Sequence, residues 1–249
     1  MSTSIHGKTI AEEVMEYECV ETDRGCKELV LVRLDGRGFN NFTKYFVKPY
    51  DEDFANCMCS VMALLMAETN AVLGYTQSDE ITLVLHKSTE AQQLYFGGRF
   101  QKIASSLSSF ATLKFNNILP EERRKLQPMF DCRAWTMPRE KVRLNIIARE
   151  LNCIKNSITN LAFAYFSHKE LMKKNSTDKL NMLEAIGVKW KDQPEHFRRG
   201  FYLQKKVNND RRVFEPIYNL PYIKDIVNAD AFIFNGEEAI VSTSTKTLL

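Results

Sequence analysis

The stretch LVRLDGRGFNNF, residues 31–42, decides how this sequence is read. It belongs to an apolar, branched run that predicts a buried β-strand over residues 29–34. The strand ends on Asp35, and Gly36 and Gly38 follow almost at once. A strand that ends on a carboxylate and opens into a glycine turn is either an ordinary turn or the edge of a binding site.

A second stretch, GYTQSDEITLVL (74–85), places two adjacent acids, Asp79 and Glu80, between apolar segments. We predict strands over residues 71–77 and 81–87, joined by a tight hairpin turn. Solvated acids are common in such turns. Two acidic turns in one sheet are more informative, because the fold can bring them together.

The composition is typical of a globular protein. The 249 residues are 44% hydrophobic and 26% charged. No window holds the ~18 consecutive apolar residues of a membrane-spanning helix, and the acidic N-terminus lacks the apolar centre of a secretion signal. We therefore expect no membrane association and an intracellular, cytoplasmic location, with an organelle as the open alternative. The six cysteines are scattered, so we expect free thiols, and no Cys/His spacing resembles a zinc site.

The net charge of +3 is too small to indicate a polyanionic partner, so the local distribution of cations matters more. Basic runs occur at residues 121–128, 173–179, 197–206 and 208–212. Each run alone is typical of a solvated surface. Together they concentrate positive charge in the middle and last third of the chain.

The first half of the chain alternates strands and helices. A helix is predicted over residues 51–70, with Asp51 as its N-cap, because apolar residues recur there at helical spacing. A second helix is predicted over 90–117, interrupted at two adjacent glycines, and a further strand over 129–138. The order is therefore strand, helix, strand, strand, helix, strand.

This order predicts an α+β fold of the ferredoxin-like type, in which both helices cover one face of an antiparallel sheet. The first and third strands then lie in the centre, and the second and fourth lie at the edges. The end of the first strand and the hairpin turn between the second and third fall at the same end of the sheet. Asp35 is therefore expected to meet Asp79.

The second half is harder to assign. From about residue 141 the pattern is helical, residues 190–206 can return to extended structure, and 207–249 follows no clear pattern. We expect residues 1–140 to form the catalytic, sheet-containing region. Residues 141–249 are expected to form a helical and C-terminal region packed on it, within a single compact unit.

Two carboxylates from separate turns at one end of a sheet suit a site for nucleotide and metal. Mg²⁺ in proteins is held by one or two carboxylates together with substrate phosphates and water, and a pair of such ions supports phosphoryl transfer. Glycines leave backbone N–H groups open to phosphate oxygens. We expect Asp35 and Asp79 to be metal ligands. Glu80 takes a secondary catalytic role, because neighbouring strand residues face opposite ways.

A triphosphate beside two metal ions still presents unpaired negative charge, so cations are expected near these acids. The candidates are Lys48, Arg99, Lys102 and Arg133. Each is chosen for its position along the chain. As a bare residue, each is also compatible with an ordinary surface charge.

These motifs resemble those of the tRNA-His guanylyltransferase superfamily. The matching segments are VRLDGRGFNNFTK, KPYDEDF, GYTQSDEITLVL, FGGRFQKIASSL, FDCRAWTMP and FRRG, in the family's order over roughly residues 29–200. The resemblance implies a polymerase-like palm with a helical companion region. It also implies addition of nucleotides to the 5′ end of tRNA in the 3′–5′ direction, and a homotetramer that places tRNA across subunits.

The resemblance further implies substrates and site residues. Asp35, the Gly36 carbonyl and Asp79 would hold two Mg²⁺ ions, beside ATP and GTP or another nucleoside triphosphate. ATP would adenylate a tRNA 5′-monophosphate, the 3′-hydroxyl of an incoming nucleotide would displace AMP, and pyrophosphate would then be removed; a 5′-triphosphate end could skip the first step. With the cations above, the nucleotide-binding positions are Asp35, Gly36, Arg37, Gly38, Phe39, Asn40, Lys48, Ser78, Asp79, Arg99, Lys102, Arg133 and Asn156.

One segment departs from the family's pattern. Eukaryotic enzymes that add a non-templated guanosine to tRNA-His carry a His-Ile-Asn-Asn motif where this chain has Ile154, Lys155, Asn156 and Ser157. An isoleucine cannot donate, accept or carry a proton, so the histidine's role is in doubt here. The pattern resembles the guanylyltransferase-like branch, which favours template-dependent repair of 5′-truncated tRNAs. We take repair as the leading interpretation and guanosine addition to tRNA-His as the alternative.

Two interpretations from other classes stay open. A nucleotide cyclase uses a similar palm with two acidic positions, but it has no need of a basic helical half. A catalytically silent RNA-binding module would need one acid to be missing, whereas Asp35, Asp79 and Glu80 are all present.

Overall fold

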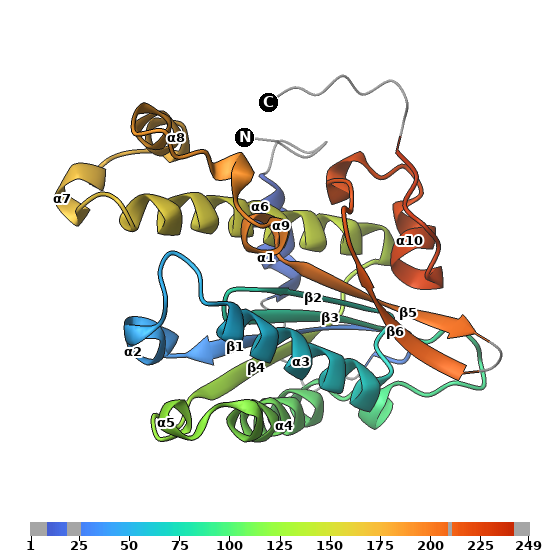
Figure 1. The fold of residues 1–249 in the computed structure, drawn as a ribbon. Coiled ribbons are helices and arrows are strands. Elements are labelled where there is room, and N and C mark those ends of the chain that lie inside the picture. Colours follow the sequence, from blue (N-terminus) through green and yellow to red (C-terminus); the bar gives the residue numbers. More distant parts are fainter. Residues whose placement is uncertain (1–8, 19–25, 209–210, 242–249) are drawn as a thin grey trace.

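The computed structural model describes residues 9–18, 26–208 and 211–241, and its centre is a six-stranded antiparallel sheet (Figure 1). The strands are β1 (Leu29–Arg37), β2 (Leu73–Gln77), β3 (Glu80–His86), β4 (Met129–Trp135), β5 (Phe201–Asn208) and β6 (Arg211–Ile217). Their order in the sheet is β4-β1-β3-β2-β5-β6. The predicted α+β fold is confirmed, with β1 and β3 between β4 and β2.

One prediction about the sheet is wrong. β2 is not an edge strand, because β5 pairs with it and β6 pairs with β5 in turn. The sheet therefore continues into the second half of the chain. The reason is local: Gly200 takes a φ of +82°, a conformation open mainly to glycine, and turns the chain from a short helix into the sheet. Tyr202 and Leu203 are then buried on opposite faces of that sheet.

Helices cover both faces of the sheet (Figure 1). α3 (Glu52–Thr69) and α4 (Phe100–Ile118) pack on one face, and α6 (Arg139–Phe163) and α10 (Ala229–Asn235) pack on the other. The remaining helices are α1 (Ile10–Glu18), α2 (Phe39–Phe42), α5 (Glu121–Arg124), α7 (His168–Leu171), α8 (Ser176–Ala185) and α9 (Glu195–Arg199), with 3₁₀ turns η1 (Thr43–Tyr45), η2 (Tyr95–Gly98), η3 (Trp190–Asp192) and η4 (Ile223–Asp225). Among the described residues, no helix is both long and apolar enough to cross a membrane.

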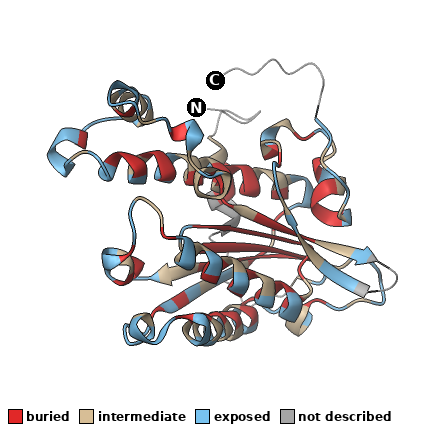
Figure 2. Ribbon diagram, in the orientation of Figure 1, coloured by how far each residue is buried: buried red, intermediate tan, exposed pale blue. Residues whose placement is uncertain are grey.

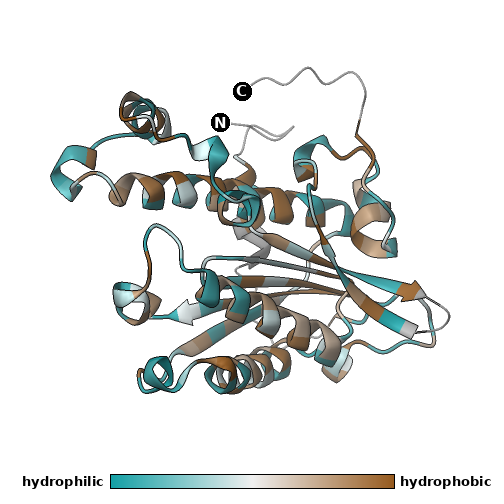
Figure 3. Ribbon diagram, viewed as in Figure 1, coloured by the Kyte–Doolittle hydropathy of each residue, from teal (hydrophilic) through white to brown (hydrophobic). Residues whose placement is uncertain are grey.

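Alternation along β1 builds a core on each side of the sheet. Val32 and Leu34 pack against α3 and α4, whereas Leu31 packs beneath α6, because successive strand residues face opposite sides. The inner strands are buried (Figure 2), and hydrophobic residues concentrate along them (Figure 3). By the same alternation, Arg33 and Asp35 lie on the face that α6 covers.

The sequence predicts the start of α3 correctly and the start of α4 incorrectly. α3 begins as predicted, because Asp51 accepts a hydrogen bond from the Phe54 N–H at 2.8 Å and caps the helix. α4 begins only at Phe100, later than predicted, because Phe96 and Gly97 take positive φ values of 49° and 62°. The cysteines of the described residues carry free thiols, as predicted, and the sixth cysteine lies outside those residues.

The C-terminal part of α6 carries a small helical arm, which lies away from the sheet (Figure 1). α7, α8 and η3 fold back on α6 around Ile158, Leu161, Leu183 and Trp190. The Trp190 Nε1–H donates to Ser157 Oγ at 3.0 Å. The arm therefore has an apolar cluster of its own, separate from the two clusters on the sheet.

Candidate active site

The end of β1 and the β2–β3 turn lie side by side. The Gly36 N–H donates to the carbonyl oxygen of Asp79 at 3.1 Å, and Asp35 pairs with Glu80 in the register of β1 and β3. Ser78 forms the corner of the turn with a φ of 49°, which is uncommon for a residue other than glycine. All three predicted acids therefore lie at one end of the sheet.

These acids repel one another. Burial raises the pKa of Asp79 to about 6, and the charge of Asp35 adds to the rise. Burial likewise raises the pKa of Asp35, with a further contribution from the charge of Asp131 that the smaller effects of Arg33 and Arg133 do not cancel. A cation beside these carboxylates would relieve the repulsion. The site therefore favours a bound positive charge.

Asp131 is a further acid beside the candidate site, and the sequence pattern did not reveal it. It lies on β4 directly opposite Asp35, and Arg133 lies directly opposite Arg33. Like charges that face each other across strands are unfavourable, so the Asp35–Asp131 pair adds to the repulsion between carboxylates at this end of the sheet. The available signal was the alternation in FDCRAW, which puts Asp131 and Arg133 on one strand face. Only the register shows which residues of β1 they meet.

Glu80 is bound to α6. Its Oε2 accepts a hydrogen bond from Arg149 Nη1 at 3.2 Å in a partly buried ion pair. Burial raises the pKa of Glu80, and the charge of Arg149 opposes the rise. The pair fastens the start of β3 to α6, so this carboxylate is placed to orient the turn that carries Asp79.

The turn after β1 presents its main chain to the site. Phe39 is buried in the core, and a Cβ at Gly36 would lie 2.4 Å from its ring, so only glycine fits there. Gly38 takes a φ of 69°, while Arg37 and Asn40 are exposed. Of the predicted nucleotide-binding residues in this segment, Phe39 can therefore contribute only backbone groups.

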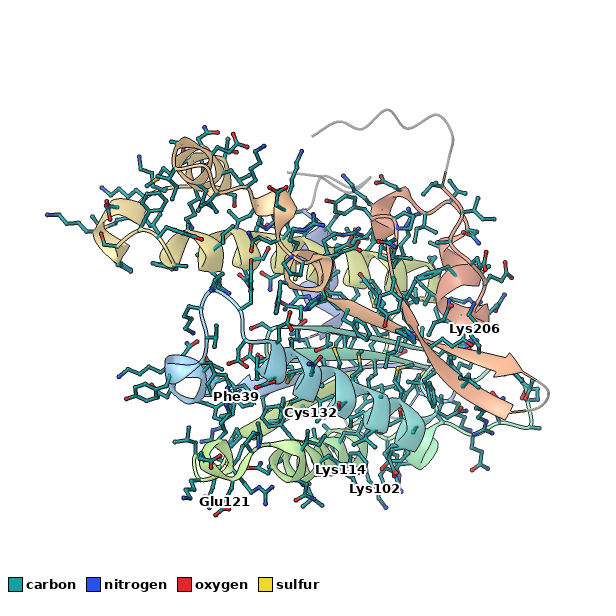
Figure 4. All side chains as sticks on the ribbon, viewed as in Figure 1. Phe39, Lys102, Lys114, Glu121, Cys132 and Lys206 are labelled. Atoms are coloured by element: carbon teal, nitrogen blue, oxygen red, sulfur yellow. The ribbon has the colours of Figure 1, made fainter. Side chains whose placement is uncertain are left out.

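The four predicted cations divide between the two ends of the sheet. Arg133 lies on β4 beside the acids, and Lys48 follows η1, where its Nζ donates to the Thr43 carbonyl oxygen at 3.1 Å. Arg99 lies at the opposite end, because the main chain next to it bonds to the segment that precedes β1. Lys102 follows on α4, apart from the turn that carries Phe39 (Figure 4). At ~3.3 Å per residue, the length of β1 puts ~20 Å between Arg99 and the acids, so these two cations cannot reach them within one chain.

A cavity of about 150 Å³ opens beside the acids. Its lining joins Ser78 of the hairpin turn and Lys48 to Asn156 on α6. Tyr50 and Phe197 also line it, stacked with ring centroids 4.3 Å apart and planes 9° apart. Aromatic walls with a few polar groups are typical of small-molecule sites.

The rim of this cavity is held by a buried carboxylate. Asp51 accepts from both Nη atoms of Arg123, each at 3.0 Å, and from the Val47 N–H at 3.2 Å. The Arg123 guanidinium also lies 4.0 Å from the centroid of the Phe46 ring. Burial alone would raise the pKa of Asp51, but the hydrogen bonds from Arg123 and the main chain outweigh it and lower the pKa. The loop that carries Lys48 is therefore anchored to α5.

The segment that departs from the His-Ile-Asn-Asn motif lies on α6. Ile154 packs against the apolar cluster of the arm, whereas Asn156 lines the cavity. Lys155 is exposed, and Ser157 is buried and bound to Trp190. The isoleucine thus has a packing role, whereas Asn156 and Ser157 both line the cavity that Ser78 also lines.

Known proteins are similar to this chain in sequence and in fold. Residues 11–138 match the family model described as tRNAHis guanylyltransferase. The chain belongs to this family. The tRNA(His) guanylyltransferase of Schizosaccharomyces pombe is 31% identical over 212 residues, which cover 78% of this chain and 79% of the relative. An uncharacterized protein of Acanthamoeba polyphaga mimivirus is 27% identical over 203 residues, which cover 71% of this chain and 70% of the relative.

Solved structures of guanylyltransferase-like proteins have a fold similar to that of this chain. A bacterial tRNA(His) guanylyltransferase (Thg1)-like protein in complex with ATP superposes with a TM-score of 0.78 at 30% identity, over 90% of this chain and 97% of that chain. The same kind of protein in complex with GTP superposes with a TM-score of 0.72 at 29% identity, over the same shares. Guanylyltransferases are nucleotidyltransferases, so the predicted enzyme class is confirmed.

Proposed function

We propose that this enzyme adds nucleotides to the 5′ end of tRNA in the 3′–5′ direction, directed by a template, and so repairs tRNAs that lack their first nucleotides. The observation that carries the proposal is the meeting of Asp35 and Asp79 beside a cavity lined by Ser78. The acidic pair suits phosphoryl transfer, and the aromatic cavity suits a nucleobase. The family to which the chain belongs supports tRNA as the acceptor.

The residues at this end of the sheet fit magnesium. Asp35, Asp79 and the Gly36 carbonyl would hold it, because a cation relieves the repulsion of the carboxylates and substrate phosphates supply the remaining oxygens. Among the described residues, no cluster of three or more acidic, histidine or cysteine side chains could hold a metal ion. This agrees with a site in which substrate phosphates supply some of the ligands. When bound, two such ions would activate the attacking oxygen and neutralise the leaving phosphate.

The proposed reaction has three steps. An oxygen of the tRNA 5′-phosphate attacks the α-phosphorus of ATP and releases pyrophosphate. The 3′-hydroxyl of the incoming nucleotide then attacks the activated 5′-phosphate and releases AMP, and hydrolysis removes pyrophosphate from the new end. Lys48 and Arg133 would bind phosphate oxygens, and the backbone of residues 36–40 would offer N–H groups to the triphosphate.

The nucleobase would enter the 150 Å³ cavity. Tyr50 and Phe197 offer aromatic surface at its wall, and Asn156 and Asn160 line it from α6 with exposed amide groups. The bacterial relative binds ATP in one structure and GTP in another, which supports a site that accepts either purine. Arg123 would act on this site indirectly, by holding the loop that forms its rim.

Repair is favoured over non-templated guanosine addition because Ile154 is committed to the apolar cluster of the arm and offers no polar group. We further propose that residues 1–140 carry the chemistry and that the basic residues of 141–249 bind RNA. The assembly would be a homotetramer in the cytoplasm. A monomer mass in solution at assay concentrations would remove the tetramer from this proposal.

The test offers the purified enzyme, Mg²⁺ and ATP to a tRNA without its first nucleotide and to full-length tRNA-His. We expect addition of the template-matched nucleotide to the truncated tRNA and little addition to the intact one. Preferred addition of guanosine to intact tRNA-His would contradict repair. Cyclic nucleotide formed without RNA would contradict the whole proposal.

A variant separates binding from chemistry. Asp79→Ala is expected to keep its affinity for tRNA and to lose nucleotide addition. Addition at the parental rate would mean that this acid does not serve the reaction. RNA affinity should fall as salt is added, because phosphate contacts release counterions, and a flat salt response would remove the role of the basic half.

A further inference from the structure

The last turn of α6 carries an aromatic ring that the fold does not use for packing. Phe163, the final residue of this helix, is 47% exposed. The apolar cluster of the arm forms around Leu161, Leu183 and Trp190 and includes Phe166 at its margin, but Phe163 is not part of it. A single exposed apolar side chain is common on protein surfaces, so the neighbours of Phe163 decide whether it has a use.

A second ring lies against Phe163. His168, the first residue of α7, stacks on it with ring centroids 6.0 Å apart and planes 20° apart. Ser167 caps α7: its Oγ accepts from the Glu170 N–H at 3.4 Å, and its own N–H donates to Glu170 Oε2 at 2.8 Å. This cap fixes the start of α7, so both rings are held in place without a ligand. His168 is exposed as well, and we call these two rings the stacked pair.

The stacked pair continues one wall of the candidate active site. Asn156 and Asn160 line the 150 Å³ cavity from α6. The spacings of four and three residues from Asn156 to Asn160 and on to Phe163 place all three on one face of the helix. At 1.5 Å per residue, Phe163 lies ~10 Å beyond Asn156 along the helix axis, and α7 follows beyond that end (Figure 1). A strand that leaves the cavity along this face of α6 therefore meets the stacked pair next.

The surroundings of the stacked pair are basic. Residues 155–179 contain five lysines and two acids, and both acids, Glu170 and Asp178, accept hydrogen bonds within the caps of α7 and α8. The exposed lysines of this segment are Lys155, Lys169, Lys173 and Lys174. Exposed rings among cations are the combination that binds single-stranded nucleic acid, because the rings stack on bases and the cations contact phosphates. A second copy of this chain fits less well, since a two-fold contact would bring the same lysines together.

We propose that the stacked pair binds the base of an unpaired nucleotide of the RNA substrate, and that the exposed lysines contact the phosphates beside it. The inference rests on the proposed function for the identity of the RNA. Templated addition to a truncated 5′ end leaves the opposite, 3′ strand unpaired at the reacting end. An unpaired nucleotide is therefore present next to the cavity, and the stacked pair holds that strand while the new nucleotide is added.

The direct test compares two RNA hairpins with the same paired stem, one blunt and one with a short unpaired 3′ extension. Fluorescence anisotropy with Mg²⁺ and without nucleoside triphosphate measures both affinities, so binding is read apart from nucleotide addition. We expect the parent to bind the extended hairpin severalfold more tightly. Phe163→Ala should weaken binding of the extended hairpin about fivefold to tenfold, as loss of a stacking ring does in single-strand binders, and should leave the blunt hairpin unaffected. Phe163→Trp should keep the parental affinity.

Two further variants complete the test. Leu113→Ala is the matched control: Leu113 is 57% exposed on α4, which packs on the other face of the sheet, so this variant should bind both hairpins as the parent does. Lys169→Gln should reduce the salt dependence of binding to the extended hairpin by about one phosphate contact. The thermal midpoint of Phe163→Ala should equal that of the parent, because the ring belongs to none of the apolar clusters of the described residues.

The proposal is overturned if the parent binds the two hairpins equally, or if Phe163→Ala binds the extended hairpin as tightly as the parent does. It is also overturned if light scattering shows a parental oligomer that Phe163→Ala dissociates, because the stacked pair would then be a contact between copies of the chain. Failure of the proposed function would look different. Nucleotide addition would be absent on every tRNA, while the preference for the extended hairpin and its loss in Phe163→Ala would remain.

Discussion

Replacing Asp79 by asparagine tests the electrostatic design of the acidic site. Burial and the charge of Asp35 raise the pKa of Asp79 from 3.8 to about 6. The pKa of Asp79 is higher in the folded state than in the unfolded state. The neutral carboxyl therefore adds stability to the fold that is fully present below about pH 4. This contribution is lost as the pH rises through 6. The interval is about two pH units, each worth ~1.4 kcal/mol, so the ionised carboxylate costs up to ~3 kcal/mol above pH 6.

We therefore expect Asp79→Asn to be more stable than the parent by about 1–3 kcal/mol near pH 7.5 without divalent metal, and equal to it near pH 4. The lower part of this range allows for the contact that Asp79 keeps with water. Urea unfolding followed by circular dichroism, in the presence of EDTA, measures the difference. Asp192→Asn, at an exposed position, is the control and should stay within about 0.5 kcal/mol of the parent at both pH values.

Magnesium should reverse the order of stability. The ion binds the folded parent and stabilises it by mass action, whereas the asparagine variant should gain little and should have lost nucleotide addition. A variant that is less stable than the parent near pH 7.5 without metal would refute the reasoning. A stability difference between variant and parent that stays the same from pH 4 to pH 7.5 would refute it as well. Such a result would mean that the pKa of Asp79 is not raised in the folded state.

Three further substitutions test other parts of the structure. Gly98→Ala should lower the free energy of unfolding by at least ~2 kcal/mol, because the glycine has a φ of +76° and an added Cβ would lie 1.8 Å from a main-chain oxygen; an unchanged thermal midpoint would contradict this close approach. Glu150→Ala should cost ~3–5 kcal/mol in urea unfolding, because it removes one partner of a buried pair with Arg199; a cost under ~1 kcal/mol would mean that the pair is not desolvated. Arg123→Met should raise KM for ATP severalfold with a smaller effect on kcat, because Asp51 loses the anchor of the cavity rim; equal KM values in variant and parent would separate the rim from nucleotide binding.

The sequence by itself determined the local elements and the chemistry of the acidic turns. Apolar alternation and helical spacing are short-range patterns, so they located β1, the hairpin turn and α3 with its Asp51 cap. The order of those elements, together with the known handedness of connections, placed Asp35 and Asp79 at one end of the sheet. The motifs around them also indicated the family to which the chain belongs.

The tertiary structure decided everything that depends on register or on partners far apart in the chain. The pairing of β1 with β4 places Asp131 beside Asp35, and the length of β1 places Arg99 at the other end of the sheet from the acids. The hydrogen bonds between Asp51 and Arg123 also join segments that are distant in the chain. Whether the buried Tyr202 hydroxyl finds a partner depends likewise on which segments surround it. Propensity and periodicity act over a few residues, whereas charge pairing, burial and cavities depend on segments that meet only when the whole chain folds.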